Sequence, residues 1–223
     1  MGTTSGAAGK VTPTVYVSVD VEADGPIPGP YSMVSFGAAV AGWHDADGFR
    51  RAPAAAAGFY QELRPVSEDW VPEALAVSGL DRAALIAGGT DPGVAMGRFT
   101  RWLERLRTGP DGRRYRPVMV GYPAVYDWQF LYWYLIRFTG SSPFGHSGCL
   151  DVKTLYAART GLPFAGIGKR SMPKELLPDL PHTHHALDDA REQAALFANL
   201  MEWDGPGRPA PRAGQRTVTG RVS

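Results

Sequence analysis

Residues 15–22, VYVSVDVE, constrain the fold more than any other stretch of this chain. The segment is rich in β-branched residues and alternates regularly, which predicts a β-strand. Residues two apart in a strand point to the same side, so the four valines share one face. Asp20 and Glu22 then project together from the opposite face, beyond Tyr16 and Ser18. The sequence therefore predicts a strand that carries two neighbouring carboxylates.

This carboxylate pair has a specific physical problem. Two adjacent carboxylates repel each other, and removing them from water costs free energy. A cation between them relieves both effects, and ligands that are all oxygen suit Mg²⁺ or Mn²⁺ better than Zn²⁺. An acid–x–acid pair at a strand end is also often simply solvated, so the pair alone does not establish a metal site.

The remaining patterns predict an α/β fold with a mixed sheet. Strands are expected over residues 15–22, 31–43 and 58–65 as an antiparallel meander, followed by helices over 72–77 and 91–107. Later elements are a strand at 117–122, a buried helix at 126–138, a short strand end and helix within 149–159, an irregular loop at 160–183 and a helix at 185–203. The helical crossover favours parallel pairing of strands 15–22 and 117–122.

The length of 223 residues suits a single folded domain. We expect a flexible leader over residues 1–13, the domain over 14–203 and a disordered basic tail over 204–223. No apolar run is long enough to cross a bilayer. The single cysteine, Cys149, cannot form an internal disulfide, which favours a reducing, cytoplasmic location. A net charge of +1 excludes a strongly basic overall surface, so nucleic-acid binding would need a local patch or metal ions.

The last helix separates two adjacent aspartates. At 100° per residue its apolar side chains occupy one half of the helix surface, and Asp189 falls in that half while Asp188 lies opposite. A carboxylate on a packing face needs a partner. That partner could be a metal ion, or a basic side chain such as Arg191.

Two further positions remain open when each is considered alone. Asp127 stands in the first turn of the helix after strand 117–122, where an acid can stabilise the helix terminus or contribute to a site at the strand's carboxyl end. His182, His184 and His185 precede the last helix and could be a cap, surface groups or a base. A zinc site is conceivable, but the lone cysteine and the adjacent carboxylates argue against a closed structural one.

Together these residues resemble the three motifs of the DEDD exonuclease superfamily, in its histidine-bearing branch. The motifs correspond to Asp20-Val21-Glu22, to Tyr126-Asp127, and to the stretch from His184 through Ala186 to Asp189. The resemblance covers about residues 14–203 and selects His184 over the other two histidines. It implies a ribonuclease-H-like fold, a five-stranded mixed sheet flanked by helices.

The resemblance also implies an activity. Asp20, Glu22, Asp127 and Asp189 would hold two Mg²⁺ or Mn²⁺ ions, and His184 would deprotonate the attacking water. The reaction would be 3′→5′ hydrolysis of single-stranded nucleic acid that releases nucleoside 5′-monophosphates. By the same analogy, the protein could be a homodimer.

Further positions are candidates for substrate contact. Ala23 stands where many relatives carry a threonine that helps to hold the terminal 3′-hydroxyl. Tyr31, Met33 and Trp128 could contact terminal bases. Asp151 resembles a further acidic position, which helix capping explains equally well.

Two other functions remain as alternatives. One is a catalytically silent nucleic-acid-binding domain, and the other is a metal-dependent phosphoesterase or endonuclease on the same fold. RNA or short oligonucleotides are favoured over DNA because a small stand-alone domain carries no polymerase or repair module.

Overall fold

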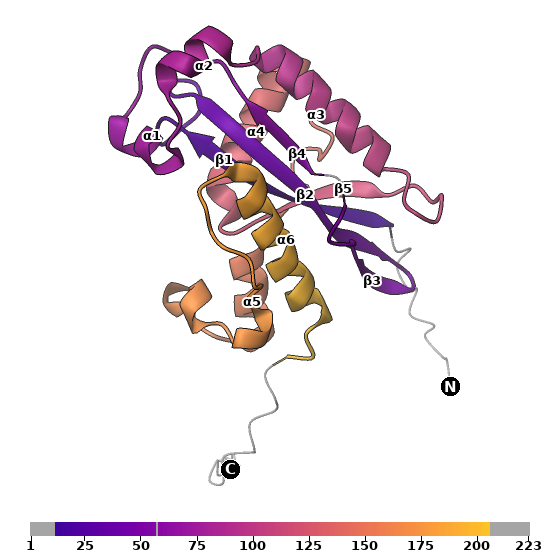
Figure 1. Ribbon diagram of the computed structural model, residues 1–223. Helices are drawn as coiled ribbons and strands as arrows, with labels where there is room; N and C mark the ends of the chain where they lie inside the picture. Colours follow the sequence, from indigo (N-terminus) through magenta and orange to yellow (C-terminus); the bar gives the residue numbers. More distant parts are fainter. Residues whose placement is uncertain (1–11, 57, 206–223) are drawn as a thin grey trace, which may run out of the picture.

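The computed structural model describes residues 12–56 and 58–205, which form a mixed β-sheet with helices on both faces (Figure 1). The strand order is β3-β2-β1-β5-β6, and β4 also pairs with β2. The strands are β1 Thr14–Ala23, β2 Met33–Asp45, β3 Gly48–Arg51, β4 Phe59–Glu62, β5 Arg116–Gly121 and β6 Cys149–Asp151. Because β3 and β4 pair with different stretches of β2, the sheet is five strands wide, as predicted.

The pairing directions also follow the prediction. β1 is antiparallel to β2 and parallel to β5, and β5 is parallel to β6. Strand β3 was not anticipated, since residues 48–51 followed a polar turn and include two arginines. It forms because β2 continues to Asp45 and would otherwise leave those backbone groups unpaired.

The helices form two layers, one on each face of the sheet. They are α1 Pro72–Ser78, α2 Arg82–Gly88, α3 Pro92–Leu106, α4 Ala124–Thr139, α5 Val152–Thr160 and α6 Ala186–Glu202. Helices α3 and α4 cover the valine face of β1, with Phe99 and Phe130 in that core. Helices α5 and α6 pack on the other face through Tyr156 and Phe197. The sequence did not indicate α2, whereas the segment between α5 and α6 is irregular as expected, with three short 3₁₀ turns.

Gly37 of β2 sets how closely α6 approaches the sheet. It pairs directly with Asp20 of β1. A Cβ atom at this position would lie 2.2 Å from the backbone nitrogen of Leu187 and 2.3 Å from the carbonyl carbon of Ala186. Only a residue without a side chain therefore allows the first turn of α6 to rest on the strand beside Asp20.

None of the helices among the described residues is long and apolar enough to span a membrane. The predicted leader and tail lie outside the described residues, apart from residues 12–13 and 204–205.

Candidate active site

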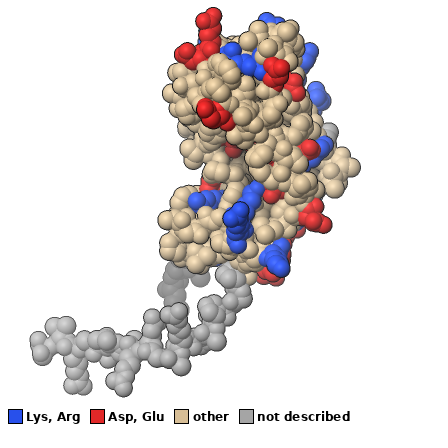
Figure 2. All heavy atoms as spheres, turned by 60° about the vertical axis from the view of Figure 1, so that its left-hand side comes forward, with Lys and Arg blue, Asp and Glu red and all other residues tan. Residues whose placement is uncertain are grey.

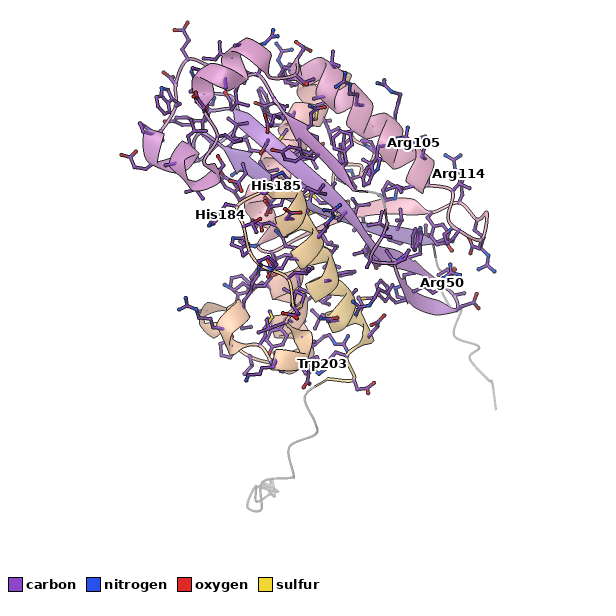
Figure 3. All side chains as sticks on the ribbon, in the orientation of Figure 1. Arg50, Arg105, Arg114, His184, His185 and Trp203 are labelled. Atoms are coloured by element: carbon purple, nitrogen blue, oxygen red, sulfur yellow. The ribbon has the colours of Figure 1, made fainter. Side chains whose placement is uncertain are left out.

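All five residues singled out from the sequence line one pocket of about 320 Å³. Asp20 and Glu22 stand at the carboxyl end of β1, and Asp127 stands in the first turn of α4, directly after β5. Asp189 lies in the first turn of α6, and the loop before that helix brings in His184 (Figure 3). Carboxylate oxygens of Asp20, Glu22 and Asp189 all lie within 4.8 Å of one another.

The two most buried acids are held by backbone amides. Oδ1 of Asp127 accepts a hydrogen bond from the amide of Val21 at 3.0 Å. Asp189, whose side chain is only 1% exposed, accepts from the amides of Thr183 at 2.8 Å and His184 at 2.9 Å. These contacts fix both carboxylates relative to β1 and to the loop that carries His184.

The distinction between the two aspartates of α6 is confirmed. The side chain of Asp188 is 47% exposed, and Arg191 pairs with it at 3.2 Å. The alternative in which Arg191 neutralises Asp189 is therefore wrong. The partners of Asp189 are backbone amides and the neighbouring His182.

The pKa values of three carboxyl groups in the pocket are raised above their usual range. Burial, with the charge of Asp189 second, raises the pKa of Asp20 to about 7. Burial, then Asp20 and Asp189, raises the pKa of Glu22 to about 8. Burial and the charge of Asp20 also raise the pKa of Asp127 well above its usual value. The negative charge of the cluster is thus only partly offset by neighbouring groups such as Lys169, and the donor set is all oxygen, which together fit hard divalent cations such as Mg²⁺ or Mn²⁺.

Gln193 is a site residue that the sequence analysis missed. Its Nε2 donates to Oδ1 of Asp20 at 2.6 Å, and its Oε1 accepts from the amide of Tyr122 at 2.9 Å. The side chain thereby ties the end of β1 to the segment that connects β5 with α4. A signal did exist, because Gln193 follows Asp189 by four residues and so shares its face of α6.

Glu192, Lys169 and His182 form a second group that was also missed. Nζ of Lys169 lies 2.6 Å from Oε2 of Glu192, and Nδ1 of His182 lies 3.4 Å from the same oxygen. Nδ1 of His182 also lies 3.2 Å from Oδ1 of Asp189. The irregular loops that carry Lys169 and His182 offered no periodic pattern from which these contacts could be predicted.

The loop before α6 separates the histidines. His184 lines the pocket and has a backbone φ of 57°, the only positive φ at a non-glycine position in the described residues. His185 instead stacks on Tyr60 with ring centroids 4.4 Å apart. The family pattern had selected His184, which is the one of these two residues that lines the pocket.

The structure separates the residues proposed for base contact. Met33 is fully buried in the core, so the expectation that its side chain contacts a substrate base is wrong. Tyr31 is half-buried, as is Trp128, whose ring stacks on Tyr132 with centroids 5.1 Å apart. Ala23 is buried at the end of β1.

Asp151 has a clear structural role. Its Oδ1 accepts from the amide of Thr154 at 2.6 Å and caps α5, while its Oδ2 accepts from the amide of Ala124 at 2.8 Å at the start of α4. Cys149 is not activated as a nucleophile, because burial raises the pKa of its thiol to about 12.

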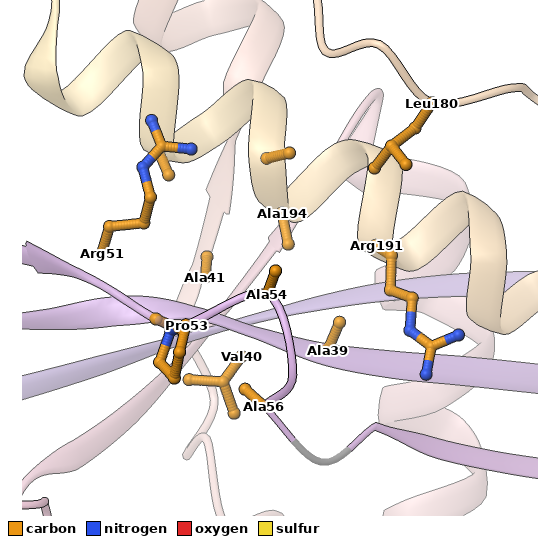
Figure 4. Close-up of a pocket in the computed structure, with 13 residues that line it drawn as sticks. Ala39, Val40, Ala41, Arg51, Pro53, Ala54, Ala56, Leu180, Arg191 and Ala194 are labelled. Atoms are coloured by element: carbon orange, nitrogen blue, oxygen red, sulfur yellow. The ribbon is translucent and has the colours of Figure 1, made fainter.

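A second pocket of about 240 Å³ lies between β2, the segment after β3 and α6 (Figure 4). Alanine side chains line most of it, with Arg51 and Arg191 also in its wall. Its described lining residues include no acid and no nucleophile, so they offer no chemistry comparable to that of the carboxylate pocket. On the face shown in Figure 2, basic and acidic side chains are interspersed, in line with the net charge of +1.

The known proteins that this chain resembles in sequence or in structure are described as nucleases. No family model matches the sequence. The chain is 37% identical over 183 residues to the 3′–5′ DNA exonuclease Cap18 of Escherichia coli, which covers 82% of this chain and 89% of that protein. Among solved structures, cell-death related nuclease 4 superposes with a TM-score of 0.60 at 13% identity, over 86% of this chain and 64% of the other. The zinc-bound complex of E. coli exonuclease I with single-stranded DNA gives a TM-score of 0.53 at 18% identity, over 85% of this chain but only 40% of that one.

Proposed function

Because this chain belongs to the DEDD 3′→5′ exonuclease superfamily, and is therefore a metal-dependent hydrolase, we propose that it degrades single-stranded DNA from the 3′ end. The observation that carries the proposal is the convergence of four acids and His184 in one pocket. The preference for RNA expected from the sequence has no support, since the relative covering most of this chain is described as a DNA exonuclease. The expected products are nucleoside 5′-monophosphates.

We assign the metal ligands to Asp20, Glu22, Asp127 and Asp189. Two Mg²⁺ or Mn²⁺ ions held there would stabilise negative charge on the attacking and leaving oxygens of the phosphodiester. The chain prepares this site in advance. Asp127 and Asp189 are fixed by backbone amides and Asp20 by Gln193, so little reorganisation is needed when substrate binds.

We assign the general base to His184. An imidazole can accept a proton from water at neutral pH, and this residue is exposed at the pocket rim. The hydrogen bond from its amide to Asp189 fixes the backbone on which the imidazole is mounted. The base and one metal ligand are therefore positioned by the same contact.

For the substrate strand, Tyr31 and Trp128 stay candidates for base contact because both are partly exposed. The backbone of Ala23 is the candidate for the 3′-hydroxyl, and Asp151 acts at most through the helices that it caps. The homodimer and the cytoplasmic location stay predictions.

The test uses 5′-labelled single-stranded DNA and RNA of the same sequence, each with Mg²⁺ or Mn²⁺. We expect a ladder that shortens from the 3′ end, faster on DNA than on RNA, and that stalls on a 3′-blocked oligonucleotide. Cleavage of the blocked strand at internal bonds would instead indicate an endonuclease. Binding without shortening, under every metal condition, would indicate a silent nucleic-acid-binding domain.

A further inference from the structure

A second set of metal-ligand atoms shares one carboxylate with the active site. Among the described residues, His182, His184 and Asp189 each offer one ligand atom, and these atoms all lie within 4.8 Å of one another. Two imidazoles and one carboxylate differ in chemistry from the all-oxygen cluster of Asp20, Glu22 and Asp189. Imidazole nitrogen suits Zn²⁺ and related transition metals, whereas Mg²⁺ prefers oxygen.

One contact in this group has the spacing expected for ligands of a small tetrahedral ion. Nδ1 of His182 lies 3.2 Å from Oδ1 of Asp189. In a tetrahedral zinc site with ligands about 2.0–2.1 Å from the metal, neighbouring ligand atoms stand roughly 3.3 Å apart. The rings of His182 and His184 have centroids 4.7 Å apart and planes at 73°, so they meet edge to face. The same 3.2 Å contact is an ion pair when His182 is protonated, and a bound cation would replace that proton.

The backbone is held in an uncommon conformation where these groups meet. His184 has a φ of 57°, in the left-handed region that a non-glycine residue adopts at a cost of roughly 1–2 kcal/mol. The hydrogen bond from its amide to Oδ2 of Asp189, at 2.9 Å, maintains this turn. The strain thus accompanies the approach of His184 to His182 and Asp189.

Access and charge also favour a cation here. The side chain of His182 is 50% exposed, so an ion can arrive from solvent. The buried carboxylate of Glu192 lies 3.4 Å from Nδ1 of His182 and adds negative charge beside the ligand set. The nearby ammonium of Lys169 is already paired with that carboxylate at 2.6 Å.

We propose that His182, His184 and Asp189 form an inhibitory Zn²⁺ site that overlaps the catalytic centre. Three protein ligands leave a fourth position for water, as in open zinc sites. Zinc bound here would occupy the imidazole of His184 and engage a carboxylate needed by the catalytic metals. The inhibition rests on the proposed exonuclease function, whereas the zinc binding does not.

The binding test is calorimetric titration of Zn²⁺ into the full chain without a polyhistidine tag, in excess Mg²⁺, which prefers the carboxylate oxygens to the imidazole nitrogens. We expect a single zinc ion per wild-type chain and an affinity at least about tenfold weaker in His182→Ala. His185→Ala is the matched control and should bind zinc like wild type, because that ring lies against Tyr60. Co²⁺ gives a second readout, with visible absorption bands of a low-coordinate ion in wild type that are lost in His182→Ala. Unchanged zinc affinity in His182→Ala, or an equal loss in His185→Ala, would overturn the assignment.

The functional test measures Mg²⁺-dependent DNA shortening at increasing Zn²⁺. With each rate expressed relative to the same protein's own zinc-free rate, His182→Ala should need at least about ten times more zinc for half inhibition than wild type. Equal zinc sensitivity of the two proteins would refute the inhibitory role. If no preparation shortens DNA at all, the proposed function fails, while the calorimetric and Co²⁺ results still decide whether the zinc site exists.

Discussion

Replacing Asp20 with asparagine should stabilise the metal-free protein at alkaline pH and remove most of the stabilisation that Mg²⁺ provides. Asparagine keeps the oxygen that accepts the 2.6 Å hydrogen bond from Gln193 and changes the side-chain volume little. What it removes is a negative charge in a cluster that also contains Glu22 and Asp189. The substitution therefore separates the electrostatic role of Asp20 from its packing role.

The magnitude follows from the pKa of Asp20, which burial and Asp189 raise from 3.8 to about 7. At about 1.4 kcal/mol per unit, an isolated group would destabilise the charged fold by up to roughly 4 kcal/mol. The neighbouring acids share the effect that raises the pKa of Asp20, and water reaches part of the site. We therefore expect Asp20→Asn to raise the free energy of unfolding by about 1–2 kcal/mol. For a chain of this size that corresponds to a rise in Tm of about 2–8 °C.

The sign depends on pH. The folded protein holds the Asp20 proton more tightly than the unfolded chain does, so wild type loses stability as the pH rises from about 4 to about 7. The stability of Asp20→Asn does not fall in this way, because asparagine has no proton to lose in this pH range. The two proteins should melt alike near pH 4 and differ most near pH 8.

Thermal unfolding in EDTA across this pH range, followed by circular dichroism, measures the difference. Repeating the series with saturating Mg²⁺ should reverse the order, because only wild type gains strongly from the ion. A Tm for Asp20→Asn at pH 8 in EDTA that equals or falls below the wild-type value would refute the electrostatic reasoning.

Three further predictions concern activity and stability. Asp189→Asn should lower kcat for DNA shortening by at least about 100-fold. In the matched Asp188→Asn, kcat should stay within about twofold of wild type, because the Asp188 side chain is exposed. Comparable losses in both variants would contradict the assignment of the α6 face. Gly37→Ala should reduce activity and Tm together, because its Cβ would meet the α6 backbone at 2.2 Å, and a fully active variant would show that α6 can shift without consequence. Arg82→Ala should lower the free energy of unfolding by about 3 kcal/mol, because it removes the cation from the fully buried carboxylate of Asp24. The Arg82 guanidinium lies 3.5 Å from that carboxylate. Denaturant titration measures the loss, and a negligible change would show that this ion pair is dispensable.

The sequence was most informative where one periodicity governs a residue's position. Strand alternation was enough to place Asp20 and Glu22 together, and the helical angle was enough to separate Asp189 from Asp188. The parallel pairing of β1 with β5 followed from the helical crossover between them, and it located Asp127. These features depend on local geometry and on a short list of permitted connections.

Other features depended on tertiary contacts with no local signal. Strand β3 exists because β2 extends far enough to pair with it, and His182 reaches Asp189 through an irregular loop. Met33 lies at the start of β2, yet its side chain is completely buried in the core on the valine face of β1. Gln193 could have been anticipated from its spacing relative to Asp189, but its amide partner on Tyr122 could not.

The close seating of α6 on Gly37 has a consequence for how the enzyme is made. During synthesis the ribosome releases β1 to β5 and α4 well before α6. Asp20 can therefore form its hydrogen bond with Gln193, 173 residues later in the chain, only after α6 has been made. Until α6 packs on the sheet, the growing polypeptide lacks the proposed base His184 and the proposed metal ligand Asp189 in their final positions. A nascent chain therefore lacks a complete active site, and we expect exonuclease activity only after α6 has packed on the sheet.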